Sequence, residues 1–228
     1  RTFQVLLDPV TSDIFEQEEG VPQGSVISVT LFLIKINEIL SSLPPTVDGR
    51  LFVDDFRITC RASHMCTIER QLQHAINKVL KWADLNGFTF SPTKTSCVHF
   101  CRKRGIHPDP EIFLNNSLIP VTNEVKFLGL ILDSKLTFKP HIQYLRKTCV
   151  TKLNLLKVLS NCSWGADTNS MIKIYRSIIR SKLDYGSAIY SSASKSVIRY
   201  LDTVHNSCRR IATGAFRTSP IKSLQVIT

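Results

Sequence analysis

Residues 49–60, GRLFVDDFRITC, set two adjacent aspartates, Asp54 and Asp55, inside an otherwise apolar run. The aromatic and β-branched neighbours predict a strand, with a turn just before it. Such a strand is expected to bury residues 51–53 and Phe56. Two carboxylates this close repel each other, so one must be protonated or a cation must neutralise the pair. Mg²⁺ is the usual cation at such a pair, and an ordinary surface turn is the alternative.

A second motif lies upstream, in EEGVPQGSVIS (residues 18–28), where Gly20 and Gly24 bracket Pro22 and Gln23 ahead of a predicted helix. Proline stiffens the loop, and Gly24 permits close backbone approach. The Gln23 amide both donates and accepts hydrogen bonds. The amides of the following helix favour an anionic ligand, although an ordinary entry from a loop into a helix explains the same pattern.

Charge is distributed unevenly over the 228 residues, whose net charge is +11. Residues 1–122 hold 12 Lys/Arg and 13 Asp/Glu, a net of −1, whereas residues 123–228 hold 17 and 5, a net of +12. A near-neutral half joined to a basic half favours a polyanionic partner, above all nucleic acid. A membrane surface and ordinary solvated helix faces are the alternatives.

Composition indicates a globular chain, with 43% hydrophobic and 21% charged residues. No apolar run is long enough to predict a membrane span. The seven cysteines are odd in number and scattered. They indicate reduced, mostly buried thiols in a reducing compartment inside the cell, nucleus or cytoplasm. A zinc site at Cys97, His99, Cys101 and His107 fits no common ligand spacing.

Periodicity divides the chain into a mixed first part and a helical second part, with the boundary near residues 134–140. Apolar residues at helical spacing predict helices over 28–43, 67–87, 141–159, 167–186 and 194–214. Alternation and turn residues predict a hairpin over 1–18, a strand pair over 88–100, a hairpin over 112–121 with Asn115–Asn116 at its turn, and a strand over 124–133.

The motifs occur in an order that resembles one family. GVPQGSVIS, a helix and then LFVDD resemble the reverse transcriptase signature, in which a P-Q-G loop precedes an aromatic-x-D-D hairpin. WADLNGFTFSPTKTSCVHF and VKFLGLILD resemble the next palm motif and the hairpin called the primer grip. IRSKLDYGSAIY and LDTVHNSCRRIATGAFRTSP resemble the thumb and connection of LINE-type (non-LTR), jockey-like retrotransposon polymerases. The resemblance implies an α+β fold, with a partial antiparallel palm over 1–134 and an all-helical thumb and connection over 135–228.

The resemblance also implies an activity: RNA-directed DNA synthesis, in which a primer 3′-hydroxyl attacks a deoxynucleoside triphosphate at a two-Mg²⁺ site. The implied partners are an RNA template with a DNA primer or an RNA–DNA duplex, the deoxynucleoside triphosphates, and the rest of a retrotransposon polyprotein (upstream fingers and palm, and an endonuclease). No membrane partner is implied.

Residue roles follow by the same resemblance. The implied metal ligands are Asp54 and Asp55, and Lys94 is the implied acid for the pyrophosphate leaving group. A surface lysine in a turn is the alternative for Lys94. The implied floor under the nascent base pair is Pro22, Gln23, Gly24 and Ser25; the implied primer grip is Phe127, Leu128 and Gly129; the implied contacts to the duplex backbone are Arg146, Lys147 and Lys152.

Departures from the family pattern lead to two further expectations. The family's first carboxylate motif lies well upstream of the P-Q-G loop, and Asp8 is too close to that loop to supply it. We therefore expect a fragment that is inactive alone. Val29, Lys35 and Phe52–Val53 stand where the family has other residues, which is typical of a diverged copy. A non-catalytic remnant that binds nucleic acid is the main alternative, and a metal-dependent nuclease is a weaker one.

Overall fold

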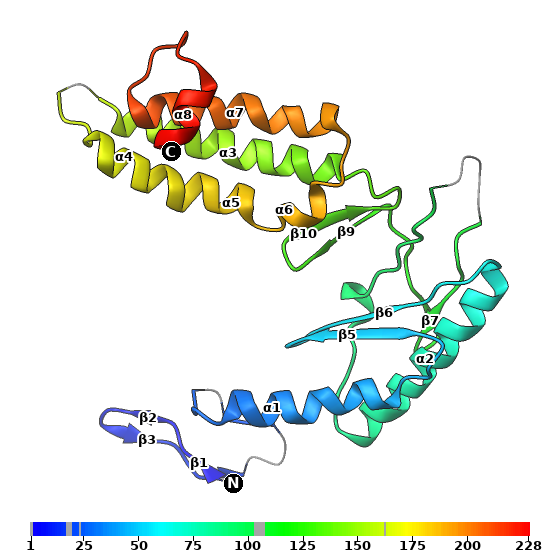
Figure 1. Cartoon of the computed structure of the whole chain (residues 1–228). Coiled ribbons are helices and arrows are strands. Elements are labelled where there is room, and N and C mark those ends of the chain that lie inside the picture. The colour runs from blue at the N-terminus through cyan, green and yellow to red at the C-terminus, as the bar shows by residue number, and fades with distance from the viewer. Residues whose placement is uncertain (1, 17–19, 23, 103–107, 162) are drawn as a thin grey trace. The chain divides into compact units, whose positions relative to one another are not determined.

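The computed structural model describes residues 2–16, 20–22, 24–102, 108–161 and 163–228 (Figure 1). Short antiparallel strand pairs interleaved with helices come first and a run of helices follows, so the predicted α+β class is confirmed. The chain divides into two units. Unit 1 holds residues 1–97 and 106–121, and unit 2 holds residues 98–105 and 122–228. The hairpin over 124–133 thus belongs to unit 2, whereas the division predicted from the sequence assigns it to the palm.

Unit 1 begins with the predicted hairpin, which forms. Strand β2 (Leu6–Leu7) pairs with β3 (Val10–Thr11) around Asp8–Pro9, and β1 (Thr2–Phe3) pairs with β4 (Phe15–Glu16). Leu6 and Leu7 are each 73% exposed, so this ribbon does not contribute to the core.

Helix α1 (Ser28–Asn37) continues as a 3₁₀ turn, Glu38–Ser42, and ends before the prolines, as predicted. The helical spacing of Val29, Leu33, Ile36 and Leu40 predicts that these residues face inward, which is only partly correct. Ile36 and Ile39 are buried, but Val29 is 63% exposed. The sequence-based face assumed 3.6 residues per turn throughout, whereas the tighter 3₁₀ turn brings Ile39 inward.

Helix α2 (Met65–Leu85) confirms the clearest helix prediction. The helical spacing predicts one apolar face made of Ile68, Leu72, Ile76, Val79 and Ala83. The last two are buried and the first three are half-buried, and Ala75 is buried as well. The chain leaves the helix through Gly87 at a φ of 69°, and the Phe88 amide donates to the Ala83 carbonyl at 2.9 Å. Glycine adopts this left-handed conformation without a Cβ penalty, so it terminates the helix as predicted.

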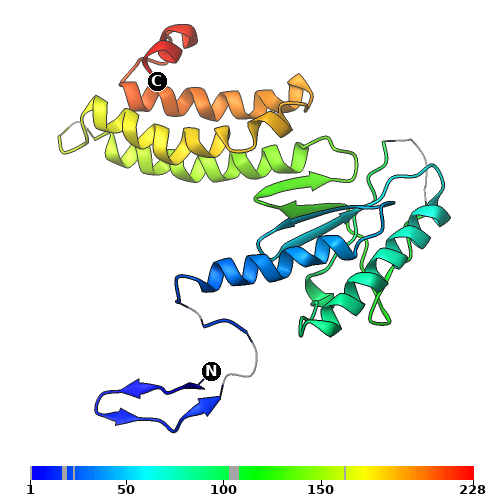
Figure 2. The same ribbon diagram turned by 60° about the horizontal axis from the view of Figure 1, so that its bottom comes forward.

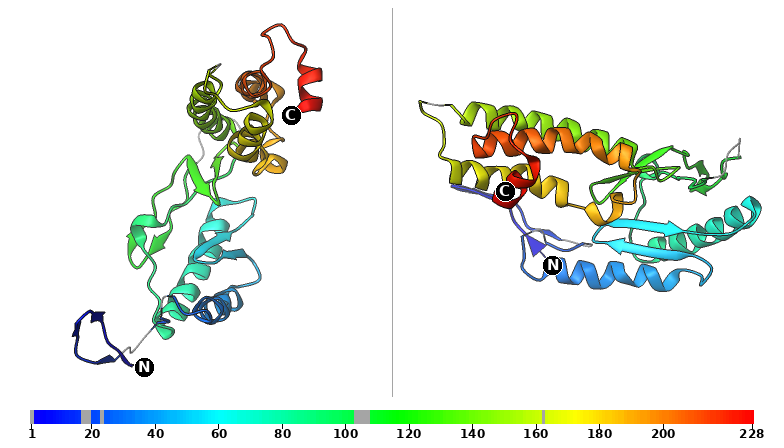
Figure 3. Two further views of the ribbon diagram at one scale, coloured as in Figure 1. Left: turned by 90° about the vertical axis from the view of Figure 1, so that its left-hand side faces the viewer. Right: turned by 45° about the horizontal axis from the view of Figure 1, so that its top comes forward.

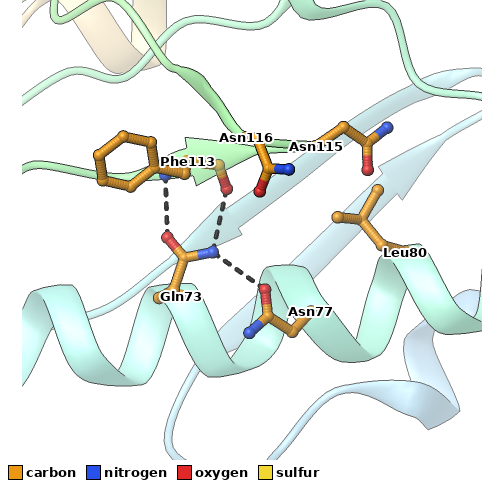
Figure 4. A pocket seen from close by; sticks show the side chains of 6 residues that line it. All are labelled: Gln73, Asn77, Leu80, Phe113, Asn115 and Asn116. Carbon is orange, nitrogen blue, oxygen red and sulfur yellow. Dashed lines mark hydrogen bonds between the residues drawn. The ribbon is translucent and has the colours of Figure 1, made fainter.

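The predicted hairpin with the asparagine turn also forms. Strand β7 (Phe113–Leu114) pairs with β8 (Ser117–Leu118), and both Asn115 and Asn116 have positive φ. Figure 4 shows how α2 holds this hairpin: the Gln73 amide donates to the Phe113 carbonyl and accepts from the Phe113 amide. One side chain therefore takes the place of a neighbouring strand at the edge of β7.

The strand pair predicted over 88–100 is wrong. A 3₁₀ turn, Pro92–Lys94, occupies its centre, and the segment makes one isolated bridge, from Cys97 to Val121. Proline fixes φ and removes an amide donor, which favours the turn over a continuous ladder.

Unit 2 is a bundle of helices, and the predicted helical period is confirmed there. Its elements are α3 (Lys139–Leu159), α4 (Thr168–Tyr175), a π-helical turn (Arg176–Arg180), α5 (Ser181–Asp184), α6 (Ser187–Tyr190), α7 (Lys195–Thr213) and α8 (Ile221–Ile227). Figures 2 and 3 show α3 and α7 side by side along their lengths. Between them lies one apolar core, which includes Ile142, Leu156, Tyr175, Ile179 and Cys208.

A polar pair joins buried Tyr175 of this core to half-buried His205. The Tyr175 hydroxyl is hydrogen-bonded to Nε2 of His205 on α7. Burial, assisted by the nearby Arg209 cation, lowers the pKa of His205 to about 4, so the imidazole is neutral at pH 7. Among the residues described, no helix is both long and apolar enough to cross a membrane.

Candidate active site and nucleic-acid interface

The two aspartates lie at the tip of a hairpin. Strand β5 (Asp48–Phe52) pairs with β6 (Asp55–Thr59), and the register places Phe52 opposite Asp55. Val53 and Asp54 therefore form a two-residue turn. Val53 has a φ of 55°, an unfavourable conformation for a β-branched residue. Both carboxylates are exposed, so the tip presents two adjacent anionic groups to whatever approaches it.

The apolar residues next to these aspartates do not behave as predicted. Phe52 is 58% exposed and Val53 is 44% exposed, while Leu51 and Phe56 are half-buried. Successive side chains of a strand point to opposite faces, so Phe52 faces away from the side on which Leu51 packs. Val53 lies in the turn itself. The expectation that residues 51–53 are all buried is wrong for these two.

The two carboxylates at the tip are the type of ligand that suits Mg²⁺. Carboxylate oxygens are the ligands that Mg²⁺ prefers, and it commonly takes only one or two of them, with water and substrate phosphates completing its shell. Within the described ranges, no group of three or more His, Cys, Asp or Glu side chains is arranged to hold a metal ion. Asp54 and Asp55 would therefore need further ligands, beyond the described residues, to hold a metal ion.

The P-Q-G loop closes onto the start of α1. The Pro22 carbonyl accepts a hydrogen bond from the Ser28 hydroxyl at 2.6 Å and from the Ser25 amide at 3.3 Å. Gly24 has a φ of 92°, and a Cβ added there would meet no atom within 4 Å. Glycine is therefore favoured at this position because of its backbone conformation, and not because a side chain would lack space. Gln23 lies outside the described residues.

Lys94 ends the 3₁₀ turn Pro92–Lys94 and is exposed. Its amide donates to the Ser91 carbonyl at 3.3 Å. In the described part of the chain, no hydrogen bond or ion pair joins its ammonium group to Asp54 or Asp55. The structure therefore does not link the three residues predicted to be catalytic into one hydrogen-bonded network.

The segment predicted to be the primer grip is a tight hairpin in unit 2. Strand β9 (Glu124–Phe127) pairs with β10 (Leu130–Asp133), and Leu128 and Gly129 form the turn, with φ values of 46° and 80°. Two successive residues with positive φ are typical of the two-residue turn that best fits the twist of a hairpin. Phe127 and Leu128 are half-buried, and Gly129 is exposed.

The basic side chains of α3 separate into two groups. Lys147 and Lys152 line a surface hollow together with Tyr144, Thr148 and Thr151. Arg146 instead lies over the Tyr200 ring of α7, with its guanidinium carbon 6.0 Å from the ring centre. The hollow therefore presents two ammonium groups, which suit phosphate oxygens, while the Thr148 and Thr151 hydroxyls donate to the Tyr144 and Lys147 carbonyls of the same helix.

One residue that extends this surface, Lys126, was missed from the sequence. Lys126 of β9 lies with its Nζ 5.7 Å from the centre of the Tyr144 ring, which is a cation–π distance. It thereby connects the hairpin to the hollow on α3. Alternation along β9 is the signal that would have identified Lys126, because Val125 and Phe127 are half-buried and Lys126 between them is exposed.

Comparison with known proteins agrees with this arrangement. Residues 4–132, more than half of the chain, match the family described as reverse transcriptase (RNA-dependent DNA polymerase). The chain belongs to this family.

Relatives come from mobile elements of insects. The chain is 28% identical over 221 residues to the RNA-directed DNA polymerase from mobile element jockey of Drosophila melanogaster, and that match covers 94% of this chain and 24% of the relative. The jockey polymerase of Drosophila funebris is equally similar, at 28% over 224 residues with the same two shares. A Pol polyprotein from the type-1 retrotransposable element R1 of Bradysia coprophila is 24% identical over 91% of this chain and 21% of the relative.

The resemblance to a LINE-type, jockey-like reverse transcriptase is thus confirmed. The chain spans about a quarter of the length of the jockey polymerases that it matches. No solved structure matches it.

Proposed function

We propose that this chain forms the palm-to-thumb part of an RNA-directed DNA polymerase of a non-LTR retrotransposon, which extends a DNA primer on an RNA template, and that this part is inactive alone. The observation that carries the proposal is the coincidence of the family match over residues 4–132 with two exposed carboxylates, Asp54 and Asp55, at a hairpin tip.

Each part of the chain has a role in this reaction. Asp54 and Asp55 hold Mg²⁺ together with ligands from outside the described residues. Bound metal stabilises the attacking and leaving oxygens of the transfer. Gly24 and the rest of the P-Q-G loop support the nascent base pair, and Lys94 donates a proton to the leaving pyrophosphate.

The helical unit holds the duplex. Lys126, Lys147 and Lys152 neutralise backbone phosphates. Such contacts are independent of sequence and sensitive to salt. The net charge of +12 over residues 123–228 supports this role.

A salt titration tests the interface. We expect Lys147→Gln to lower the slope of log Kd against log salt for an RNA–DNA duplex by about 1, and Lys152→Gln to do the same. The matched control is Lys157→Gln, an exposed lysine of α3 that does not line the hollow. Equal slopes for Lys147→Gln and Lys157→Gln would contradict the assigned interface.

A non-catalytic remnant that binds nucleic acid is the second candidate. It is favoured by the absence, among the described residues, of a three-ligand metal group around Asp54 and Asp55. The two functions separate in one experiment on the product of the complete reading frame that contains this chain. A polymerase extends an annealed primer on RNA when Mg²⁺ is present, whereas a remnant binds the same duplex with a salt-sensitive Kd and extends nothing.

A further inference from the structure

The turn of the β9–β10 hairpin is attached to the helices of unit 2 by one side chain. Tyr185, which lies between α5 and α6, donates its hydroxyl hydrogen to the Leu128 carbonyl at 2.7 Å. Its ring lies against the other turn residue, since a Cβ added to Gly129 would be 3.2 Å from Cε1 of Tyr185. The side chain thus contacts both residues of the turn, although it comes from a segment 57 positions away.

Gly186, the residue after Tyr185, allows the junction between α5 and α6 to lie close to the hairpin. Gly186 has a φ of 69°, and a Cβ added there would lie 2.5 Å from Cδ2 of Leu130, the first residue of β10. Any larger side chain would require the Leu130 side chain or the α5–α6 junction to shift, and the positive φ would strain it as well. The Tyr185–Gly186 pair therefore combines a hydrogen bond with a close contact, and both are directed at residues 128–130.

The rest of the hairpin is attached to α3. The Ile131 amide donates to Nδ1 of the buried His141 at 3.3 Å, and Asp133 accepts from the amides of Thr137 and Phe138 at the start of α3. The Asp133 bonds lie at the far end of β10 from the turn, whereas the Ile131 bond and the buried Leu130 side chain lie close to it. Leu128 and Gly129 extend beyond Leu130, and without the Tyr185 hydrogen bond these two turn residues would open more readily than the strands that follow them.

Tyr185 is itself 57% exposed, so its ring contributes little to the core of unit 2. An exposed tyrosine that reaches a turn carbonyl is better explained by fixing that turn than by stabilising the bundle. This distinction matters because the turn contains Leu128 and Gly129, two of the three residues predicted to form the primer grip.

We propose that Tyr185 is a positioning residue for the primer terminus: through Leu128 and Gly129 it fixes the primer-grip turn to the same helical unit that holds the duplex. The proposal rests on the polymerase function proposed above. Its consequence is that the primer 3′ end and the duplex backbone are held by a single body, so that a duplex seated on α3 presents its terminus to the turn in one register.

The test variant is Tyr185→Phe, which keeps the ring against Gly129 and removes only the hydroxyl. The matched control is Tyr200→Phe, because Tyr200 is another exposed tyrosine of unit 2, and its ring keeps the contact with Arg146 in the variant. The first measurement is amide hydrogen exchange over residues 124–133 of the complete reading-frame product. We expect exchange to be about 2- to 10-fold faster in Tyr185→Phe and unchanged in Tyr200→Phe, as the loss of one hydrogen bond predicts.

The second measurement is cross-linking to a photoreactive nucleotide at the primer 3′ end of an RNA–DNA duplex. We expect Tyr185→Phe to lower the yield of cross-links to residues 127–129 by about 2- to 10-fold while the duplex Kd stays unchanged. A tyrosine with a merely structural role would change both or neither. Unchanged exchange, or an unchanged cross-link yield, overturns the proposal.

The two measurements also separate this proposal from the proposed function. If the wild-type protein binds no duplex, the polymerase function fails, and the positioning role fails with it. If the wild-type protein binds and cross-links but Tyr185→Phe behaves as Tyr200→Phe does, only the positioning role fails.

Discussion

The start of α3 depends on one carboxylate, and its removal gives the sharpest stability prediction. Asp133 is 8% exposed, and its two oxygens accept from the Thr137 amide at 2.9 Å, the Thr137 hydroxyl at 2.9 Å and the Phe138 amide at 2.7 Å. Phe138 is buried in a left-handed conformation, with a φ of 57°, which is costly for a residue with a Cβ. Asp133→Ala leaves that strained residue without a partner for its amide.

The magnitude follows from the two residues that lose their acceptor. We take about 2 kcal/mol for the buried Phe138 amide and about 1 kcal/mol for the exposed Thr137 groups, which can turn to water. The expected loss in the free energy of unfolding is therefore about 3 kcal/mol. At a urea dependence of about 1.5 kcal/mol per M, the unfolding midpoint falls by about 2 M.

Urea unfolding followed by circular dichroism measures this midpoint. Asp167→Ala is the matched control, because Asp167 caps α4 with the same kinds of bond, to the Asn169 amide and to the Ser170 amide and hydroxyl, but is exposed. Its midpoint should fall by much less. Equal shifts in the two variants, or a shift below about 0.5 M for Asp133→Ala, would refute the reasoning.

The same residue gives a pH dependence. Burial acts to raise the pKa of Asp133, but the hydrogen bonds from Thr137 and Phe138 outweigh it and leave the pKa lowered. A lowered folded-state pKa means that the stabilisation is complete above the unfolded-state value near pH 4 and is lost as the pH falls through the folded-state value. Asp133→Ala should lack this acid-sensitive contribution.

Two other groups give independent predictions. The pKa of His205 is lowered from 6.5 to about 4, so the unfolded chain binds its proton first, and stability should fall as the pH drops from 6.5 to about 4. After a discount for partial exposure we expect a loss of about 2 kcal/mol, absent in His205→Gln and measured by unfolding at each pH. Gln73→Ala removes both bonds to the Phe113 backbone and should speed amide exchange over residues 112–119 about 5-fold or more. Asn77→Ala, which removes only a bond to Gln73, should change it little, and equal effects would contradict the assigned role of Gln73.

Local patterns predicted the regular elements of this chain well. The stripe that includes Val79 and Ala83 follows directly from the helical period, and Gly87 ends that helix for a reason that is visible in the sequence. The Asn115–Asn116 turn was equally predictable, because these residues tolerate positive φ.

Features that depend on distant contacts were not predictable. Phe52 has the composition of a core residue, but its exposure depends on which face of the hairpin packs against other elements. The strand pair around Pro92 failed because a local turn outweighed a weak alternation. The link from Tyr185 to Leu128 joins residues 57 positions apart, and no local pattern indicates it.

Some residues of the candidate site could likewise be predicted from the sequence, and others could not. The sequence motif identified Asp54 and Asp55, and the structure adds that both lie exposed at a hairpin tip. The family resemblance implied Lys147 and Lys152, whereas Lys126 joins them only through the fold of β9 beside Tyr144. Charge patterns indicate a polyanionic partner, but the surface that meets it depends on the packing of β9 against α3.

Primer extension by an Asp54→Asn variant tests the central claim most directly. The complete reading-frame product is incubated with a DNA primer annealed to RNA, deoxynucleoside triphosphates and Mg²⁺, and duplex Kd is measured in parallel. Asp54→Asn keeps the shape of the side chain and removes its charge, so the account predicts Mg²⁺-dependent extension by the wild type, its loss in the variant, and an unchanged Kd. Extension by Asp54→Asn at the wild-type rate would contradict the account.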